Sequence, residues 1–130
     1  MRNDPTSVMI FAAGFGSRMG RLPEDRPKPL IEVAGRSLID HALDIAAVAE
    51  STVINIHYKA EMMRTHLTDR NVALSEEQPD ILETGGGLKA ALPLLGRGPV
   101  ITMNSDAVWS GPNPLTTVLQ RWNPDIMDAL

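Results

Sequence analysis

The sequence has 130 residues and no cysteine, so it forms no disulfide, no thiolate metal site and no cysteine nucleophile. Positive charge is not in excess either. The net charge at pH 7 is −4, and no run of lysine and arginine suits an anionic membrane. The apolar run at residues 8–13 is too short to span a membrane. We therefore expect a cytoplasmic protein with no nucleic-acid and no membrane partner.

Several common catalytic patterns are missing as well. There is no Ser-His-Asp arrangement, no nucleophile elbow and no evident general base. The three histidines, His41, His57 and His66, share no spacing typical of a metal site, so we expect surface or packing roles for them. The informative residues are instead charged residues and glycines.

The order of secondary-structure patterns predicts the fold class. Hydrophobic residues make up 43% and charged residues 22% of the chain, which is ordinary for one soluble domain. Apolar or β-rich runs predict strands, apolar residues at helical spacing predict helices, and Ser37 with Asp40 resembles a capping box. Strands alternating with helices indicate an α/β three-layer sandwich with a mostly parallel sheet. The predicted strands are 8–13, 52–56, 71–75 and 99–104, with an extended piece at 30–33, and the predicted helices are 37–49, 59–67, 90–95 and 114–122.

A glycine-rich loop follows the first predicted strand. Its backbone N–H groups can converge on an anion, and Arg18 and Lys28 add cations suited to phosphate oxygens. The loop has no Lys-Ser or Lys-Thr after a glycine, as a Walker A loop needs, and its third glycine is one residue late for a dinucleotide fingerprint. Prolines 23, 27 and 29 deny a regular helix, so we expect an extended loop that carries Lys28 back toward the glycines.

Two further segments carry candidate chemistry. Asp106 follows the last predicted strand, where a carboxylate could hold Mg²⁺ beside a triphosphate or simply cap the next turn. Thr84 and the glycines at 85–87 permit close backbone approach to a flat group, or form a glycine-rich turn before a helix. Because ligands of parallel sheets bind beyond the carboxyl ends of the strands, we expect these segments to share one edge with the glycine loop.

Together these motifs resemble the signature of the sugar-1-phosphate nucleotidyltransferases, also called NDP-sugar pyrophosphorylases. The match consists of Gly14-x-Gly16-Ser17-Arg18-Met19 followed by Pro27-Lys28-Pro29-Leu30. Within that family, the segment Glu83-Thr84-Gly85-Gly86-Gly87 is similar to the E-T-G-G-G stretch of members that transfer uridylyl groups. The resemblance is nearest to the uridylyltransferases that act on N-acetylmuramate 1-phosphate, a type similar to the mannose-1-phosphate guanylyltransferases. The resemblance implies a Rossmann-like nucleotidyltransferase fold.

The resemblance also implies an activity and roles for single residues. A nucleoside monophosphate group would pass from an NTP, preferably UTP, to a sugar 1-phosphate. The products would be an NDP-sugar and pyrophosphate, and the cofactor would be Mg²⁺. The catalytic residues would be Arg18 on the leaving β- and γ-phosphates, Lys28 on the phosphates across the transfer, and Asp106 on the metal. The nucleotide-binding residues would be Ala12, Ala13, Gly14, Gly16, Ser17, Thr84, Gly85 and Gly86.

Enzymes of this family are normally longer than this chain. We therefore expect residues 1–130 to be the N-terminal nucleotide-binding part of a nucleotidyltransferase domain truncated at its C-terminus, inactive on its own, with a further strand beginning at 128–130. Two other interpretations remain open. One is a non-catalytic nucleotide-binding module, and the other is a transfer on the same fold to another phosphorylated acceptor, such as phosphocholine or a pterin cofactor.

Overall fold

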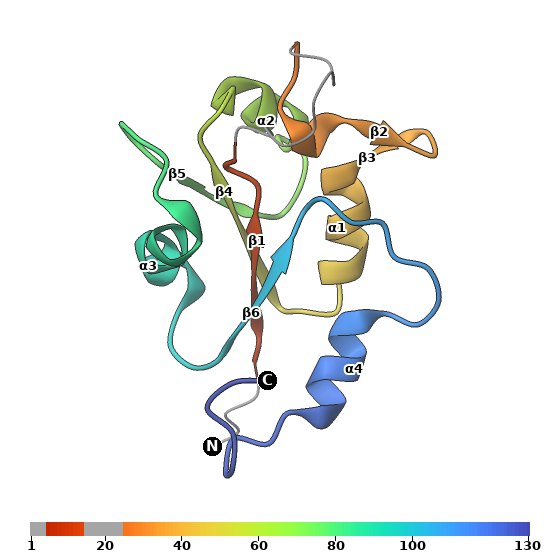
Figure 1. Ribbon diagram of the computed structural model, residues 1–130, viewed down its shortest axis with the longest axis vertical. Helices are drawn as coiled ribbons and strands as arrows, with labels where there is room; N and C mark the ends of the chain where they lie inside the picture. The colour runs from red at the N-terminus through yellow and green to blue at the C-terminus, as the bar shows by residue number, and fades with distance from the viewer. Residues whose placement is uncertain (1–4, 15–24) are drawn as a thin grey trace.

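A four-stranded parallel sheet forms the centre of the computed structural model, which describes residues 5–14 and 25–130 (Figure 1). The strands are β1 (Ser7–Phe11), β4 (Ser51–Ile56), β5 (Ala73–Glu76) and β6 (Val100–Asn104), in the order β5-β4-β1-β6. All three pairings are parallel. The chain thus runs from β1 to β4 and β5 on one side and then returns to place β6 on the other side, as the predicted parallel sheet requires.

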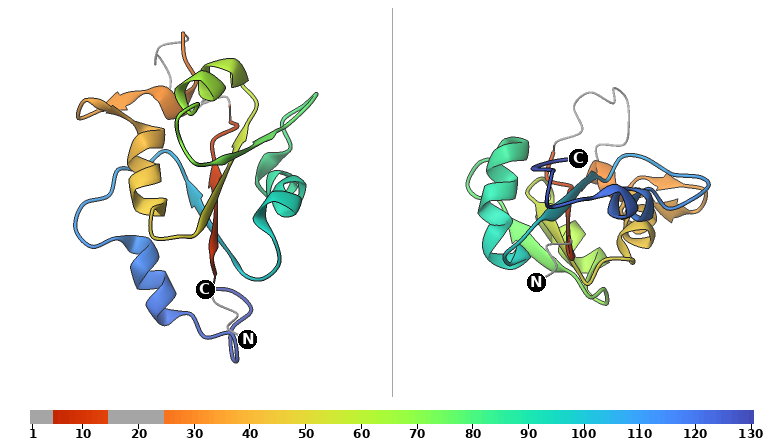
Figure 2. Two further views of the ribbon diagram at one scale, coloured as in Figure 1. Left: turned by 180° about the vertical axis from the view of Figure 1, so that it is seen from behind. Right: turned by 90° about the horizontal axis from the view of Figure 1, so that it is seen from below.

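Helices cover both faces of the sheet, which confirms the three-layer prediction (Figures 1 and 2). Successive side chains of a strand point to opposite faces. Val8 and Ile10 of β1 therefore pack into the larger core cluster, whereas Met9 packs into the smaller one with Ala91 and Leu95 of α3. The larger cluster lies under α1 (Leu38–Ala46), α2 (Ala60–His66) and α4 (Pro114–Arg121), and the smaller under α3 (Glu83–Leu95).

Helix α1 begins where the sequence predicts a cap. The Ser37 hydroxyl accepts a hydrogen bond from the backbone N–H of Asp40 at 3.2 Å, which satisfies one of the first free N–H groups of the helix. Five of its six apolar residues are buried in the core, namely Leu38, Ile39, Ala42, Leu43 and Ala46, and Ile45 is partly buried against the same core. The helix ends at Ala46, three residues before the predicted end at 49.

The sequence predicts an extended segment around Lys28, and the structure differs from that prediction. The prolines of this segment do exclude an α-helix, but Lys28–Leu30 form one 3₁₀ turn (η2). A two-stranded hairpin follows, with β2 (Glu32–Val33) antiparallel to β3 (Arg36–Ser37). Ala34 and Gly35 connect the strands, both at positive φ (54° and 78°), as a two-residue type I′ turn requires. Strands of two residues leave no periodic signal in the sequence.

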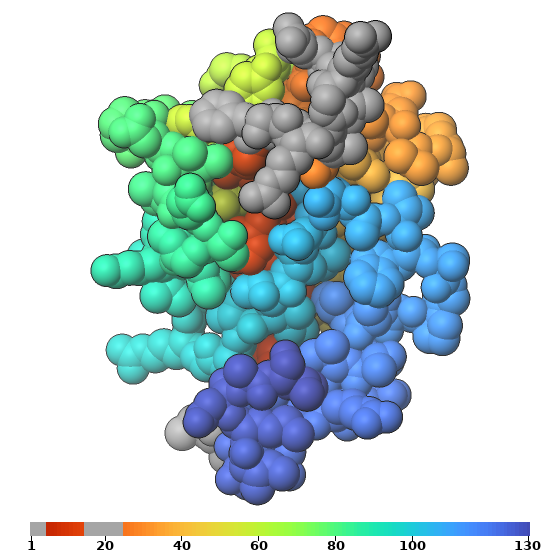
Figure 3. Space-filling model, in the orientation of Figure 1, coloured from red at the N-terminus to blue at the C-terminus, as the bar shows by residue number. Residues whose placement is uncertain are grey.

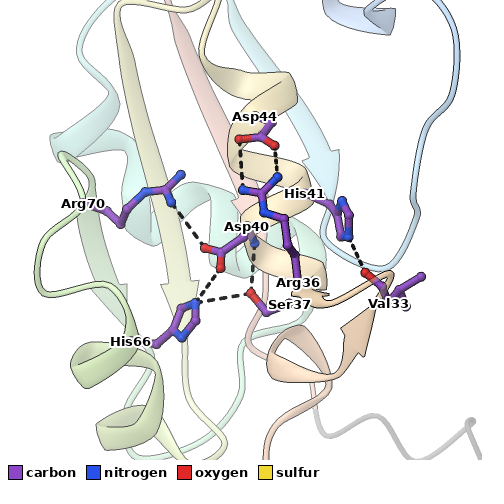
Figure 4. A network of polar contacts seen from close by, with 8 residues as sticks. All are labelled: Val33, Arg36, Ser37, Asp40, His41, Asp44, His66 and Arg70. Atoms are coloured by element: carbon purple, nitrogen blue, oxygen red, sulfur yellow. Dashed lines mark hydrogen bonds and ion pairs between the residues drawn. The ribbon is translucent and has the colours of Figure 1, made fainter.

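A polar network ties this hairpin to the helices beside it (Figure 4). Arg36 of β3 forms a forked ion pair with Asp44 of α1, and this hydrogen-bonded guanidinium lowers the pKa of the Asp44 carboxyl. A second carboxylate, Asp40, lies 3.1 Å from the His66 ring of α2 and 3.4 Å from Arg70. Because η2 directly precedes the hairpin and contacts α1, the network also steadies the segment that carries Lys28.

Helix α3 differs most from its prediction. The sequence predicts a helix only at 90–95, but α3 begins at Glu83 and includes the three glycines at 85–87. Glycine lowers helix propensity by about 1 kcal/mol relative to alanine, which hides the first turns in the sequence. Gly87 is nevertheless required there: a Cβ at this position would lie 2.5 Å from the Glu77 Oε2 atom and 2.9 Å from the Asn55 Nδ2 atom.

Smaller differences concern the ends of elements. The first strand stops at Phe11, so Ala12 and Ala13 lie beyond it, at the start of the loop. The predicted strand beginning at 128–130 is wrong, because these residues form no strand in the structure. No helix in the described ranges, 5–14 and 25–130, is long and apolar enough to cross a membrane.

Glycines 85 and 87 offer a matched test of this packing. Gly87→Ala should lower the free energy of unfolding by roughly 1–3 kcal/mol, because its methyl group would overlap Glu77 and Asn55. Gly85→Ala should raise it by up to about 1 kcal/mol, because its Cβ meets nothing within 4 Å and alanine favours the helix. Urea unfolding of both variants measures the difference, and equal effects would contradict the packing described for α3.

Candidate active site

A cleft of about 460 Å³ opens at the carboxyl ends of the strands. Phe11 of β1 is in register with Asn55 of β4 and with Asn104 of β6, so these three strands end within one residue of the same level. The cleft adjoins the point where the strand order reverses, where open α/β sheets bind ligands. In Figure 3, β1 is visible between the green segment that leads into α3 and the blue segment that contains β6. The lining residues are Phe11, Ala12, Ala13, Gly14, Lys28, Pro29, Asn55, Glu77, Ile81, Glu83, Thr84, Asn104, Ser105 and Asp106.

The peptide group between Phe11 and Ala12 is held from both sides. Its carbonyl oxygen accepts a hydrogen bond from the Ser105 hydroxyl, just beyond β6, at 2.8 Å. Its N–H donates to the Asn55 Oδ1 atom of β4 at 2.6 Å. Buried polar backbone groups need such partners, and here both partners are side chains of the two flanking strands. The plane of this peptide, and with it the direction in which the chain enters the glycine loop, is therefore fixed.

A buried carboxylate extends this arrangement to the opposite wall. The Asn55 amide donates to Glu77 Oε2 at 3.0 Å, and the backbone N–H of Leu82 donates to Glu77 Oε1 at 3.0 Å. Leu82 is the residue from which α3 starts. Asn55 and Glu77 are only 3% and 2% exposed. The loop after β1 and the start of α3 are thus connected through two side chains.

Two of the three charged residues predicted for catalysis, Lys28 and Asp106, face each other across the cleft. The Lys28 ammonium lies 3.1 Å from Asp106 Oδ2, although the residues are 78 positions apart in the sequence. Their side chains are 25% and 44% exposed, so water and ligands reach both. An ammonium ion suits phosphate oxygens, and a carboxylate at the end of a strand suits a divalent cation.

The structure gathers most of the predicted site residues and leaves some apart. Lining the cleft are Ala12, Ala13, Gly14, Lys28, Thr84 and Asp106. Gly85 and Gly86 lie in the first turns of α3 and do not line the cleft. Gly16, Ser17 and Arg18 lie outside the described residues. The grouping of Lys28, Asp106 and the end of β1 at one sheet edge agrees with the prediction.

Sequence reasoning missed the polar residues that organise the cleft. Asn55 interrupts an otherwise apolar buried strand, and a polar side chain in that position must have a partner, so a signal was present. Ser105 and Glu77 gave no such signal. Glu77 lies in the acidic segment 76–80, where Glu76 is exposed and Glu77 is buried.

The residues of the cleft fit Mg²⁺ only together with a substrate. Within the described part of the chain, no three His, Asp or Glu residues converge as a metal site. Mg²⁺, however, is often bound by one or two carboxylates, with substrate phosphates and waters as the remaining ligands. Asp106, exposed at the lip of the cleft and opposite Lys28, provides one such carboxylate.

Comparisons with known proteins agree with this geometry. A family model described as the MobA-like NTP transferase domain matches residues 8–129. The N-acetylmuramate alpha-1-phosphate uridylyltransferase of Caulobacter vibrioides is 44% identical over 140 residues, covering 99% of this chain and 58% of the relative. The mannose-1-phosphate guanyltransferase of Hypocrea jecorina is 32% identical over 114 residues, covering 80% of this chain and 31% of that protein.

A solved structure extends the likeness to the fold. The inositol-1-phosphate CTP transferase from T. maritima superimposes with a TM-score of 0.76 over 95% of this chain and 52% of its own, at 15% identity. At that identity the likeness concerns the fold alone. This chain spans little more than half the length of the Caulobacter protein.

The ion pair across the cleft should contribute little to folding. Lys28→Met and Asp106→Asn should each change the free energy of unfolding by less than about 1 kcal/mol, because partly exposed ion pairs are weak. Both variants should keep the far-ultraviolet circular dichroism spectrum of the parent chain. A loss of several kcal/mol in either variant would mean that the pair serves stability rather than ligand binding.

Proposed function

The chain belongs to the MobA-like NTP transferase family, and from this membership we propose that it carries the nucleotide-binding part of a sugar-1-phosphate nucleotidyltransferase. The proposed reaction joins an NTP and a sugar 1-phosphate to give an NDP-sugar and pyrophosphate. The single observation that supports it best is the convergence of Lys28, Asp106 and the loop after β1 in one cleft.

The proposed reaction needs charge compensation more than proton transfer. A sugar phosphate is already anionic near neutral pH, so its oxygen can attack the α-phosphorus without a general base. The obstacle is repulsion between that phosphate and the triphosphate. A cation about 4 Å away contributes on the order of 4 kcal/mol at an effective dielectric constant near 20. Lys28, which lines the cleft, would supply this attraction, and the backbone N–H groups of Ala13 and Gly14 would add fixed dipoles.

Binding of a triphosphate would exchange the partners of Lys28. In the structure its ammonium group neutralises Asp106, and phosphate oxygens in the cleft would compete for the same ammonium. Asp106 would then be free to hold Mg²⁺, which would supply further positive charge beside the phosphates. We also propose that Arg18, from the matching glycine motif, binds the leaving β- and γ-phosphates.

The proposed base is uracil and the proposed acceptor a hexose-type 1-phosphate. The name of the Caulobacter relative, at 44% identity, favours UTP over the other nucleotides. Thr84, at the start of α3, lines the cleft and would lie beside the base. The name of the Hypocrea relative keeps GTP as the competing choice.

Substitution of the two charged residues tests the proposed transfer. Lys28→Ala and Asp106→Ala should each lower the rate of pyrophosphate release roughly 10²–10³-fold, by analogy with the loss of one electrostatic donor in other active sites. Lys89→Ala on the outer surface of α3 and Asp69→Ala after α2 are matched controls, because both residues are exposed and neither lines the cleft. Full turnover in Lys28→Ala or Asp106→Ala would remove the proposed roles.

A nucleotide panel tests the base and the metal. We expect pyrophosphate release from UTP with N-acetylmuramate 1-phosphate or another hexose 1-phosphate, and its loss on addition of EDTA. Because we expect residues 1–130 alone to be inactive, the assay uses UTP, GTP, CTP and ATP with a protein that also carries the C-terminal part present in the longer Caulobacter relative. A preference for GTP or CTP would overturn the uridylyl assignment alone. Nucleotide binding without pyrophosphate from any pair of substrates would favour a non-catalytic module.

A further inference from the structure

Two buried side chains that line the cleft, Asn55 and Glu77, also connect its walls. We infer that Asn55 and Glu77 are positioning residues that hold the Phe11–Ala12 peptide at a fixed distance and orientation from the start of α3. Their effect on nucleotide binding rests on the proposed function, whereas the connection itself is a property of the fold.

The connection is a continuous run of hydrogen bonds. It passes from the Ala12 N–H to Asn55 Oδ1 (2.6 Å) and from Asn55 Nδ2 to Glu77 Oε2 (3.0 Å), and it ends with the Leu82 N–H donating to Glu77 Oε1 (3.0 Å). Each of the three bonds joins a different pair of segments: β1 to β4, β4 to the loop after β5, and that loop to α3. Both carboxylate oxygens of Glu77 are thereby occupied by groups of the protein itself.

The direction of each bond dictates the residue types. The Asn55 amide must place its oxygen toward the Ala12 N–H, which leaves its NH₂ group facing Glu77. Residue 77 is then met by two donors, from Asn55 and from Leu82, and must accept at both of its terminal atoms. An ionised carboxylate does so, whereas a glutamine in either orientation would oppose one donor with another.

The surroundings leave no freedom for another arrangement. Asn55 and Glu77 are almost completely buried, and the backbone of Gly87 packs so closely on both that a Cβ there would overlap Glu77 Oε2. The backbone carbonyl of Glu77 is also fixed, because it lies 2.7 Å from His57 Nδ1. A donor left without an acceptor in this interior costs far more than one at the surface, where water replaces the lost partner.

The functional consequence is the geometry of the nucleotide pocket. On one side, the Phe11–Ala12 peptide sets the direction of the backbone at Ala13 and Gly14, which line the cleft. On the other side, Leu82 sets where Thr84 lies. A ligand that contacts both walls binds well only when their separation is constant. Neither Asn55 nor Glu77 need touch the ligand to have this effect.

An isosteric exchange of the two residues tests the inference. In Glu77→Gln, the new NH₂ group faces another donor, from either Asn55 or Leu82. In Asn55→Asp, the new carboxylate faces the Glu77 carboxylate. Each single variant therefore breaks the run of hydrogen bonds. The double variant, which combines Asn55→Asp with Glu77→Gln, restores it. The carboxylate now at position 55 accepts from the Ala12 N–H and from the amide now at position 77, and the oxygen of that amide accepts from Leu82. We expect each single variant to raise the Kd for UTP roughly tenfold or more, and the double variant to return it close to the parent value.

The rescue separates positioning from direct contact. If the Glu77 carboxylate itself bound the base or a metal, moving the charge to position 55 would not restore binding, and the inference would be wrong. Ser7→Ala is the matched control, because Ser7 joins β1 to Ser51 of β4 and to the Leu95 carbonyl of α3 at the opposite end of the same strands. It should lower the melting temperature but leave the Kd for UTP unchanged. An equal rise in Kd in Ser7→Ala would overturn the inference.

Hydrogen exchange at two amides makes the outcome independent of catalysis. The Ala12 and Leu82 N–H groups should exchange faster in both single variants and regain protection in the double variant. Protection that follows this pattern while the parent chain binds no nucleotide would refute the proposed function and leave the connection intact. If the parent chain binds UTP and both single variants bind it equally well, the positioning role would be refuted and the proposed function would stay intact.

Discussion

The Phe11–Ala12 peptide is the constraint on which the candidate site depends. At the carboxyl end of a parallel strand, backbone groups lose their regular partners, and a loop leaving the strand can take many directions. Here the carbonyl of this peptide accepts from Ser105 and its N–H donates to Asn55, so side chains of both neighbouring strands continue the ladder by one step. The loop that follows starts from a defined plane, which a cradle of N–H groups requires.

The same constraint explains why polar residues are buried in an otherwise apolar sheet. Val8, Met9 and Ile10 fill the two cores, and their burial provides the main driving force for folding. Asn55 and Glu77 provide acceptors for two backbone N–H groups that apolar side chains would leave unpaired, and in doing so they specify one geometry. No buried side-chain nitrogen or oxygen in the described part of the chain lacks a partner, so this specificity comes without an unsatisfied group.

Much of the fold was predictable because its signals are local. The apolar strand before the glycines, the capping serine of α1 and the alternation of strands with helices all follow from residues close together in the sequence. The first turns of α3 were missed because three glycines suppress the helical signal, whereas the contact that keeps Gly87 small comes from Asn55 and Glu77, distant in sequence. Glu76 and Glu77 are adjacent and chemically identical, and only the tertiary structure separates the exposed residue from the buried one.

The central claim is that a nucleoside triphosphate binds with its phosphates on the loop after β1 and against Lys28. A crystal structure of the chain with Mg²⁺ and a non-hydrolysable UTP analogue tests it most directly. The claim predicts phosphate oxygens within hydrogen-bonding distance of the Gly14 N–H and the Lys28 ammonium, with Lys28 released from Asp106. Triphosphate bound elsewhere, with the ion pair between Lys28 and Asp106 still closed, would contradict it.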